Sequence, residues 1–599
     1  MPIYESYITA DTSSRDPNAP IVLRDEQKDA VKMAKNHFRG KGSKQFLWNA
    51  KMRFGKTLSA LQLAKEMGVR RTLIVTHRPV VETNFREDFE KIFKDEHSNW
   101  DYASRFDDEE TGSGSLDALE AKLAEDPNHH FVFFASMQYL RRSSLVNSRP
   151  GADDNPIKKQ ILETDWDLVV VDEAHEGTDT ALGKKVIDTL RKADTKMLHL
   201  SGTPYKLYNQ FGEKEVYTWD YIKEQRAKRD WQPKDMLDTE NPYATLPEMK
   251  IFTYDLSKLA GSDAVAGGKT FSLSEFFSVW KKEGRRDNPD GMPEGALGRF
   301  KYEEAVKNFL DLLCSTDSDN NYPFSTEEYQ ENFHHTLWVV PGVKEAKALS
   351  RMLKEHDIFG HGAFKIINVA GNGDEDEQRA DALDKVMEAI GDDPDQTYTI
   401  TISCGRLTTG VTVKPWTAVF YLKGADSTGA STYMQTIFRV QSADVRNGKM
   451  KSQCYVFDFA PDRSLKAVAE ASRFAAKAAR QSSKNKDKDK DSEGKSDEKQ
   501  QLEEFLSFCP VISLDGGKMV EFKAESLFEQ INHVYNDRIA RNGFNDNALY
   551  DIDYILNSMS NEELDLIGGL DDVDDTGKRK PVKKKTVFVD INKNGLTPA

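Results

Sequence analysis

Cysteine is scarce in this sequence, and the few cysteines are far apart. The chain of 599 residues has four, Cys314, Cys404, Cys454 and Cys509, and no two of them form a C-x-x-C pair. This spacing argues against both a disulfide framework and a structural zinc site. We therefore expect a protein of a reducing compartment, the cytoplasm.

Long hydrophobic runs are absent as well. No stretch approaches the ~20 apolar residues that a membrane-spanning helix requires, so we expect no membrane partner. The N-terminal sequence MPIYESYITADTSSRD lacks the basic start and the apolar segment of a secretory signal. Positive charge is also in deficit, because 83 Lys and Arg residues face 99 Asp and Glu, a formal net charge of −16. The protein is not coated with basic surface, although one cleft can still hold positive potential for nucleic acid.

Short apolar runs bounded by turns recur along the chain and predict β-strands. They are continuous rather than alternating, as in parallel strands covered on both faces. One series covers residues 46–50, 72–76, 131–136, 168–172 and 197–203, and a second covers 336–340, 365–370, 398–403, 418–423 and 454–459. Helix-like segments between several runs indicate βαβ units, so we expect two α/β lobes with doubly wound sheets.

Three other segments break this pattern. Residues 205–330 are charged and irregular, and we interpret them as an insertion or linker. Residues 481–501 are of low complexity without an apolar residue to bury, which predicts a disordered linker. The basic run 578–585 is interpreted as a solvated tail. The expected organisation is an extension (1–20), lobe one (21–204), the insertion (205–330), lobe two (331–465), a helix and linker (466–501), a small, mostly helical accessory segment (502–570) and a charged tail (571–599).

A partial phosphate-loop pattern lies in WNAKMRFGKTLSALQLAKE, residues 48–66. Gly55, Lys56 and Thr57 fit G-x-x-x-x-G-K-[ST], but Ala50 takes the place of the first glycine. The glycine lets backbone N–H groups approach phosphate at a helix N-terminus. The lysine would reach the β- and γ-phosphates, and the threonine hydroxyl would bind Mg²⁺. On these residues alone, a chance match in an ordinary loop stays open.

A second chemical signal is VVVDEAHEGTD, residues 169–179, where an apolar strand runs into two carboxylates. Asp172 could hold Mg²⁺ and Glu173 could accept the proton of an attacking water. The alternative is a strand that ends in a polar turn. The phosphate-loop pattern weakens this alternative, because a lysine and a metal carboxylate must flank the same phosphates.

The letters DEAH at 172–175 complete a resemblance to superfamily-two helicases and translocases, in particular the DEAD/DEAH-type motors of restriction and phage-defence systems. The resemblance covers about residues 20–465, and its strength is the order of the motifs, since each alone is weak. They are LRDEQKDAV (23–31), AKMRFGKT (50–57), LIVTHRPVV (73–81), DEAH (172–175), LSGTPY (200–205), LTTGVTV (407–413) and QTIFRVQS (435–442). In this family the first glycine of the phosphate loop is often alanine.

The resemblance implies two tandem RecA-like domains with ATP and Mg²⁺ in the cleft between them. Thr57 and Asp172 would hold the metal. The nucleotide and its chemistry would involve Arg24, Gln27, Gly55, Lys56, Thr57, Asp172, Glu173, Gln435 and Arg439. Ser201 and Thr203 would couple this site to nucleic acid. Contacts to nucleic acid would come from Thr76, His77, Arg78, Ser136, Gln138, Thr408 and Thr409, with a plain strand-end turn as the alternative for Ser136 and Gln138.

The sequence departs from the family pattern at the end of the last motif. Two arginines three residues apart are usual, whereas here Ser442 follows Arg439, and Arg446 is a candidate replacement. Thr412 also stands where an acidic residue is common. Since an arginine finger contributes roughly 10³–10⁵ in rate in related NTPases, the missing arginine bears directly on turnover.

Three functions stay open. The first is an ATP-driven helicase or translocase, on DNA rather than RNA, as the motor of a restriction or defence complex with a methyltransferase or nuclease as partner chain. The second is a motor-linked nuclease, based on the D…E-x-K spacing of Asp515, Glu521 and Lys523. The third is an ATP-dependent nucleic-acid clamp that does not cycle.

Overall fold

The computed structural model forms two compact units, residues 1–527 and 528–599. Among the residues it describes, no helix is long and apolar enough to cross a membrane. Described are residues 3–6, 21–76, 82–94, 99–105, 107, 115–147, 155–174, 181–202, 210–233, 241–254, 273–281, 292–315, 322–371, 382–408, 411–424, 429–460, 463–465, 467–468, 471–472, 492–515, 518–521, 523, 589–592 and 595–598.

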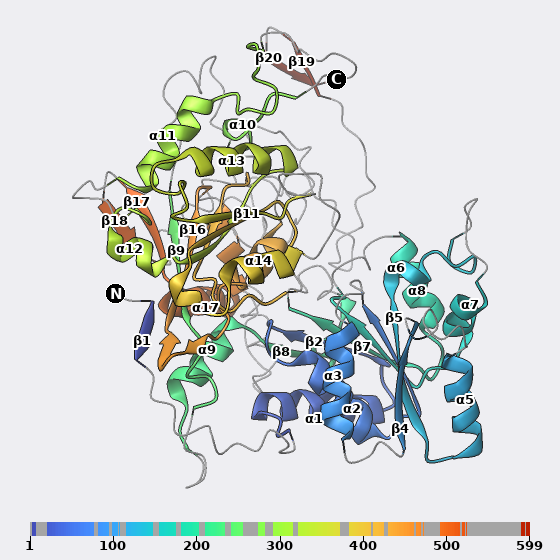
Figure 1. Ribbon diagram of the computed structural model, residues 1–599. Coiled ribbons are helices and arrows are strands. Elements are labelled where there is room, and N and C mark those ends of the chain that lie inside the picture. The colour runs from blue at the N-terminus through green and yellow to red at the C-terminus, as the bar shows by residue number, and fades with distance from the viewer. Residues whose placement is uncertain are drawn as a thin grey trace. The chain divides into compact units, whose positions relative to one another are not determined.

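The first sheet has seven strands in the order β4-β5-β3-β6-β7-β2-β8, and each neighbouring pair is parallel (Figure 1). Its strands are β2 (Gln45–Ala50), β3 (Arg71–Thr76), β4 (Trp100–Ser104), β5 (His130–Ser136), β6 (Leu168–Asp172), β7 (Lys196–Ser201) and β8 (Val216–Trp219). Its helices are α1 (Asp25–Arg39), α2 (Lys56–Met67), α3 (Glu82–Phe93), α5 (Ser115–Glu125), α6 (Met137–Leu140), α7 (Pro156–Glu163) and α8 (Ala181–Leu190). This sheet with its helices is lobe one.

Both faces of this sheet are covered, which explains the continuous apolar runs. Within β6, Val170 belongs to a core cluster shared with α1, α2 and α3. Its neighbours Val169 and Val171 belong to a second cluster, shared with α5, α7 and α8. Successive residues of a strand point to opposite faces, so the two helix groups lie on opposite sides of the sheet.

The second sheet has eight strands in the order β11-β12-β10-β13-β16-β9-β17-β18, parallel except for the β17–β18 hairpin. Its strands are β9 (Glu248–Thr253), β10 (His335–Val339), β11 (Lys365–Asn368), β12 (Thr399–Ser403), β13 (Ala418–Tyr421), β16 (Gln453–Asp458), β17 (Val511–Asp515) and β18 (Lys518–Glu521). Helices in this part of the chain are α9 (Tyr221–Asp230), α10 (Leu273–Phe276), α11 (Glu303–Leu313), α12 (Glu327–Asn332), α13 (Val343–Glu355), α14 (Ala382–Ile390), α15 (Ala430–Ile437) and α17 (Ser492–Phe508). This sheet with the helices packed on it is lobe two.

A stack of aromatic rings fills the core of lobe two. The Trp338 and Phe420 ring centroids are 4.7 Å apart, and Phe420 and Phe457 are also 4.7 Å apart. These rings come from β10, β13 and β16, which are neighbours in the sheet. A small sheet of β1 (Tyr4–Ser6), β15 (Lys449–Lys451) and β14 (Val445–Arg446) is not hydrogen-bonded to the second sheet, but Tyr4 packs against the same core cluster.

The fold class predicted from the sequence is confirmed, since two parallel sheets with helices follow one another in the chain. The segment 205–330, expected as an insertion, also contributes a strand to each sheet. β8 pairs with β2 in lobe one, and β9 lies between β16 and β17 in lobe two. The chain therefore enters the second sheet before residue 331.

The C-terminal part differs from its expectation over residues 492–501. They begin helix α17 rather than a disordered linker, and the helix packs against α9 through an ion pair of 2.6 Å between Arg226 and Glu504. Residues 524–570 of the accessory segment, expected to be mostly helical, lie outside the described residues. In the second unit, β19 (Val589–Asn592) and β20 (Gly595–Pro598) form an antiparallel hairpin.

Candidate nucleotide-binding site

Predicted site residues lie at the ends of parallel strands in lobe one. Thr76 of β3 is in register with Asp172 of β6 on one side and with Ser136 of β5 on the other. Ser201 ends β7 opposite Asn49, one residue before the end of β2. All of these positions therefore lie along the carboxyl edge of one sheet, where open α/β sheets bind their ligands.

The phosphate-loop pattern forms a tight turn between β2 and α2. Gly55 has φ +83° and is the residue before the helix, which begins at Lys56. The left-handed backbone favours glycine here, and a Cβ atom on Gly55 would lie 2.4 Å from Nε2 of Gln27, so that amide would have to move. Lys56 turns its Nζ back over the loop and donates to the Ala50 carbonyl at 3.0 Å.

Residues at the N-terminus of α1 hydrogen-bond to this loop. The Arg24 guanidinium donates to the Phe54 carbonyl at 2.9 Å and to the Arg53 carbonyl at 3.2 Å. The Gln27 amide donates to the Phe54 carbonyl at 2.8 Å, and its oxygen accepts from the Arg24 N–H at 2.8 Å. Arg24 and Gln27, both predicted to bind the nucleotide, are thus directly beside the loop.

The acidic turn leaves β6 sharply. Glu173 has φ +47°, a left-handed conformation that is uncommon for a residue other than glycine. The next residue, Ala174, is fully buried, and its N–H donates to the Leu200 carbonyl of β7 at 2.9 Å. This bond holds the turn against β7, so Asp172 and Glu173 stay beside Ser201. His175 lies outside the described residues.

Lobe two brings Arg439 to the same loop. The arginine follows α15 and is almost fully buried, as is Gln435 within that helix. Its Nε donates to the Thr408 carbonyl at 3.1 Å and its Nη1 to the Val411 carbonyl. Its Nη2 contacts the Met52 sulfur at 2.9 Å. Arg439 therefore contacts the loop that leads to Lys56, although the two residues belong to different lobes.

Arg53 makes the reverse connection, from the loop of lobe one to the turn after α15. Its guanidinium donates to the Phe438 carbonyl at 3.2 Å, to the Arg439 carbonyl at 3.3 Å and to the Ser442 hydroxyl. The candidate replacement Arg446 is elsewhere, in ion pairs with Asp395 at 2.9 Å and Asp444 at 2.6 Å. The interpretation of Arg446 as the missing arginine is therefore wrong, because two carboxylates hold it away from the loop.

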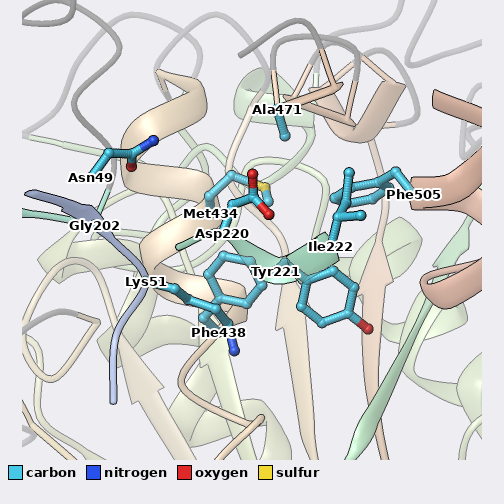
Figure 2. A pocket seen from close by; sticks show the side chains of 10 residues that line it. All are labelled: Asn49, Lys51, Gly202, Asp220, Tyr221, Ile222, Met434, Phe438, Ala471 and Phe505. Carbon is cyan, nitrogen blue, oxygen red and sulfur yellow. The ribbon is translucent and has the colours of Figure 1, made fainter. Parts of the chain in front are cut away.

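A pocket opens beside this junction (Figure 2). It is lined by Asn49, Lys51, Gly202, Asp220, Tyr221, Ile222, Met434, Phe438, Ala471 and Phe505. Lys51 lies at its wall, with Nζ 5.0 Å from the centre of the Phe438 ring, and forms a buried ion pair with Glu224. Burial lowers the pKa of Lys51, and the neighbouring Glu224 carboxylate opposes that shift.

The residues predicted to contact nucleic acid or to couple it to the nucleotide differ in their exposure. Ser136 is buried and accepts from the Tyr139 N–H at 3.3 Å, so it caps the short helix α6, while Gln138 is exposed. Thr408 is buried and donates to the Gly405 carbonyl at 2.8 Å. Four predicted residues lie outside the described part of the chain: His77, Arg78, Thr203 and Thr409.

Several residues of the site gave no separate signal in the sequence. Glu224 lies in the segment expected as a linker, and its partner Lys51 is far away in the chain. Met52 and Phe438 contact the opposite lobe through a sulfur and a carbonyl, respectively. Motif spacing cannot reveal such contacts because they depend on how the lobes meet.

The structure thus combines two parallel-sheet lobes with a phosphate-loop turn that residues of both lobes contact. Residues 20–206 match the family model described as ResIII, type III restriction enzyme, res subunit. The predicted resemblance to superfamily-two motors of restriction systems is thereby confirmed. A Mycoplasma pneumoniae protein named as the C-terminus of a type II restriction enzyme and methyltransferase is 27% identical over 624 residues, 95% of this chain and 80% of that protein.

Two solved structures are similar at lower levels. One is the ATP-dependent type ISP restriction-modification enzyme LlaBIII bound to DNA, with 13% identity, a TM-score of 0.46 and coverage of 87% of this chain and 33% of that one. The chain thus spans only a third of that enzyme's length. The other is Dbp5 of S. cerevisiae bound to RNA and ADP BeF3, with 12% identity, a TM-score of 0.39 and coverage of 75% and 87%. The family match and the Mycoplasma relative support an ATP-dependent motor of the restriction type.

Proposed function

We propose that the protein is a Mg²⁺-dependent ATP hydrolase that moves along double-stranded DNA as the motor of a restriction or defence complex. One observation carries the proposal: the turn that ends in Lys56 is contacted by Arg439 from the other lobe through Met52. A nucleotide held at that turn would touch both lobes. Its hydrolysis could then change how the lobes meet, and so drive movement.

The residues present fit a nucleotide with its metal ion. Gly55 keeps the mouth of the turn free of a side chain, and a Cβ on Gly202 would lie 3.7 Å from Lys56 Nζ, in the space beside that amine. Thr57 opens α2, whose N-terminus favours phosphate. Asp172 ends β6, two strands away from the strand that leads into the turn. In this assignment Thr57 and Asp172 hold Mg²⁺, which when bound neutralises charge on the phosphates.

Each lobe supplies part of the chemistry in this proposal. Lys56 binds the terminal phosphates, and Glu173 accepts the proton of the attacking water. Gln435 and Arg439 approach from lobe two, where Arg439 now donates to the Thr408 and Val411 carbonyls. Since Thr408 is itself a proposed nucleic-acid contact, Arg439 links that contact to the nucleotide.

Nucleic acid would run across the carboxyl edge of lobe one and the loop containing Thr408. We assign it the contacts Thr76, His77, Arg78, Ser136, Gln138, Thr408 and Thr409, with Ser201 and Thr203 as the coupling residues. Such contacts go mainly to phosphates and read little sequence. DNA is favoured because the Mycoplasma relative carries the name of a restriction enzyme and methyltransferase; a methyltransferase or nuclease partner follows from the same comparison.

The motor-linked nuclease is not favoured by the geometry of the β17–β18 hairpin. Asp515 pairs with Lys518 at one end of the hairpin, whereas Glu521 pairs with Ile512 at the other. The two carboxylate positions are therefore three steps apart along the strands, roughly 10 Å. Positions an odd number of steps apart lie on opposite faces of a hairpin, so this register does not place both carboxylate positions at one metal ion.

The test is ATP turnover measured in parallel with double-stranded DNA, single-stranded DNA and RNA. We expect double-stranded DNA to stimulate turnover most. Glu173→Gln should lower turnover by about 10²–10⁴-fold, because a general base contributes that much, while nucleotide still binds. Lys56→Ala should lose both ATP turnover and nucleotide binding.

The matched control is Lys122→Ala, because Lys122 lies on α5 and pairs with Asp101 at 2.6 Å, away from the strand ends. It should leave turnover unchanged. Turnover unaffected by the two site variants would refute the assignment. Tight ATP-dependent binding of DNA without turnover would show that the protein is a clamp and not a motor. A larger stimulation of turnover by RNA than by DNA would show that RNA is the substrate.

A further inference from the structure

Arg53 stands in a backbone conformation that suits glycine better than arginine. Its φ is +69°, two residues before Gly55 with φ +83°. A side chain in this region costs of the order of 1 kcal/mol or more, whereas glycine adopts it freely. Strain of this kind in a functional turn is a reason to ask what the side chain does.

The side chain of Arg53 leaves its own lobe altogether. Its guanidinium lies at the C-terminal end of α15, where it donates to the Phe438 and Arg439 carbonyls and to the Ser442 hydroxyl. The carbonyls that end a helix carry partial negative charge, so a cation is favoured there. The planar fork of arginine spreads its donors over three nitrogens and can reach acceptors that are far apart, whereas a lysine has its donors on one nitrogen.

The electrostatic surroundings are those of a shared cationic junction. Arg53 repels both Lys51 and Lys451, while the Glu224 carboxylate favours the charges of Lys51 and Arg53 and the Asp444 carboxylate favours that of Lys451. Burial lowers the pKa of Arg53 to about 10, so the guanidinium stays charged at neutral pH. Holding this charge between the lobes is unfavourable by itself, and the acceptors after α15 offset that cost.

Ser442 leaves room for only one arginine at this place. The serine is almost fully buried, and its hydroxyl donates to the Arg439 carbonyl at 3.0 Å while it accepts from Arg53. A long side chain at position 442 would have to occupy the volume that the Arg53 guanidinium fills. The small residue at 442 and the strained arginine at 53 therefore form a complementary pair.

We propose that Arg53 is a positioning residue that ties the nucleotide turn of lobe one to the Arg439 turn of lobe two, and that Ser442 is its seat. The proposal rests on the proposed ATPase function. When the turn at residues 51–55 moves with its phosphate, Arg53 carries the movement to the backbone of Arg439. Arg439 in turn holds the loop containing Thr408. Arg53 thus sets the placement of Arg439 and need not touch the phosphate.

The primary test is Arg53→Gly, because glycine accepts the left-handed backbone and removes the side chain without adding strain. We expect DNA-stimulated kcat for ATP to fall by about 10- to 100-fold, as for a misplaced catalytic group, with KM and nucleotide affinity within about threefold of wild type. Arg53→Lys keeps the charge but not the fork, and should be nearly as slow.

The second test changes the seat instead of the arginine. Ser442→Ala removes one of the three acceptors of the Arg53 guanidinium and leaves the Phe438 and Arg439 carbonyls, so kcat should fall by about two- to tenfold. In the double variant Arg53→Gly with Ser442→Ala, kcat should be no lower than in Arg53→Gly alone, because the hydroxyl acts through Arg53. A double variant in which the two losses multiply overturns the proposed pairing. An unchanged kcat in Arg53→Gly overturns the positioning role. A loss of nucleotide affinity as large as the loss of kcat in this variant overturns it as well.

Arg70→Ala is the matched control. Arg70 is also half-buried and donates to a carbonyl, that of Leu123 at 2.7 Å, but it precedes β3 at the opposite edge of the sheet. It should leave kcat unchanged. If the wild-type protein itself shows no DNA-stimulated turnover, the proposed function fails. An active wild type with an equally active Arg53→Gly variant rejects the role of Arg53 alone.

Discussion

The two lobes share a parallel-sheet architecture but present their functional residues in different ways. In lobe one the residues stand at strand ends and in the turns that follow them, as with Asp172 after β6 and Lys56 after β2. In lobe two they stand at the end of a helix and on a loop, as with Arg439 and Thr408. Strand ends are fixed by the sheet, whereas a helix end can shift with its neighbours, so the adjustable half of the site belongs to lobe two.

The hydrophobic cores of the two lobes also differ. Lobe one has two hydrophobic clusters, one on each face of its sheet. In lobe two, Trp338, Phe420 and Phe457 are stacked across three strands within one cluster, and the buried rings of Trp416, Tyr421 and Tyr433 lie outside it. A sheet covered on both faces is a rigid support for the residues at its strand ends. In lobe two the stacked rings make the sheet rigid, and α15 packs on that lobe.

The largest expected effect comes from removing the lobe-two arginine. Arg439→Ala should lower ATP turnover by about 10³-fold or more, since an arginine finger contributes on that scale, and should change nucleotide affinity much less. Steady-state turnover and nucleotide titration measure the two quantities. The matched control is Arg446→Ala, an arginine of the same lobe held by Asp395 and Asp444. An equal loss in both variants would erase the distinction drawn between these arginines.

A smaller effect is expected from the cores. Trp338→Ala in lobe two and Trp48→Ala in lobe one each remove a fully buried ring, and each should lower the free energy of unfolding by about 3–5 kcal/mol. Denaturant unfolding followed by fluorescence and by circular dichroism would show whether each variant shifts its own transition. Val22→Ala, at a side chain 78% exposed, is the control. One shared transition in both variants would mean that the lobes unfold as one unit.

The smallest expected effect is a pH dependence carried by one buried histidine in each lobe. Burial lowers the pKa of both His199 and His335 to about 3. His335 is neutral in a defined form, since Nε2 donates to the Pro394 carbonyl at 2.8 Å and Nδ1 accepts from the Thr399 hydroxyl at 2.9 Å. The unfolded chain, with a pKa near 6.5, takes up the proton first.

Stability is therefore fully present above about pH 6.5 and is lost as pH falls toward 3, at up to ~1.4 kcal/mol per pH unit for each histidine. Denaturant unfolding between pH 7 and 4 would measure this slope. His335→Gln and His199→Gln should each flatten it, whereas His361→Asn, at an exposed position, should not. Identical slopes in all variants would show that neither histidine is responsible.

The strands that the sequence predicted are buried on both faces, except for β11 at the edge of the second sheet, which is largely half-buried. β6 has the predicted bounds, Leu168–Asp172, because its four valine and leucine residues are all buried. The strands that it did not predict are different. β4 and β8 form the two edges of the first sheet, where fewer apolar residues are needed. β9 alternates buried and less buried residues within a charged segment, so its apolar signal was diluted.

The candidate site was predictable where it depends on local chemistry. Gly55, Lys56 and the acidic turn were placed by patterns of a few residues, and the structure brings them to one edge of the sheet. Their roles stay predictions until turnover is measured. The contact between Arg53 and Ser442 joins residues 389 positions apart. No local pattern encodes such a pair, and its only trace in the sequence was the missing second arginine.

The position of β9 has a consequence for dividing this protein into parts. β9 comes from residues 248–253, yet it lies between β16 and β17 in the second sheet. A fragment that begins after residue 254 would leave the backbone N–H and C=O groups of β16 without their neighbour, an open edge prone to aggregation. Isolated expression of the C-terminal half should therefore begin before Glu248, and any natural break in a two-gene version of this chain should fall upstream of the same strand.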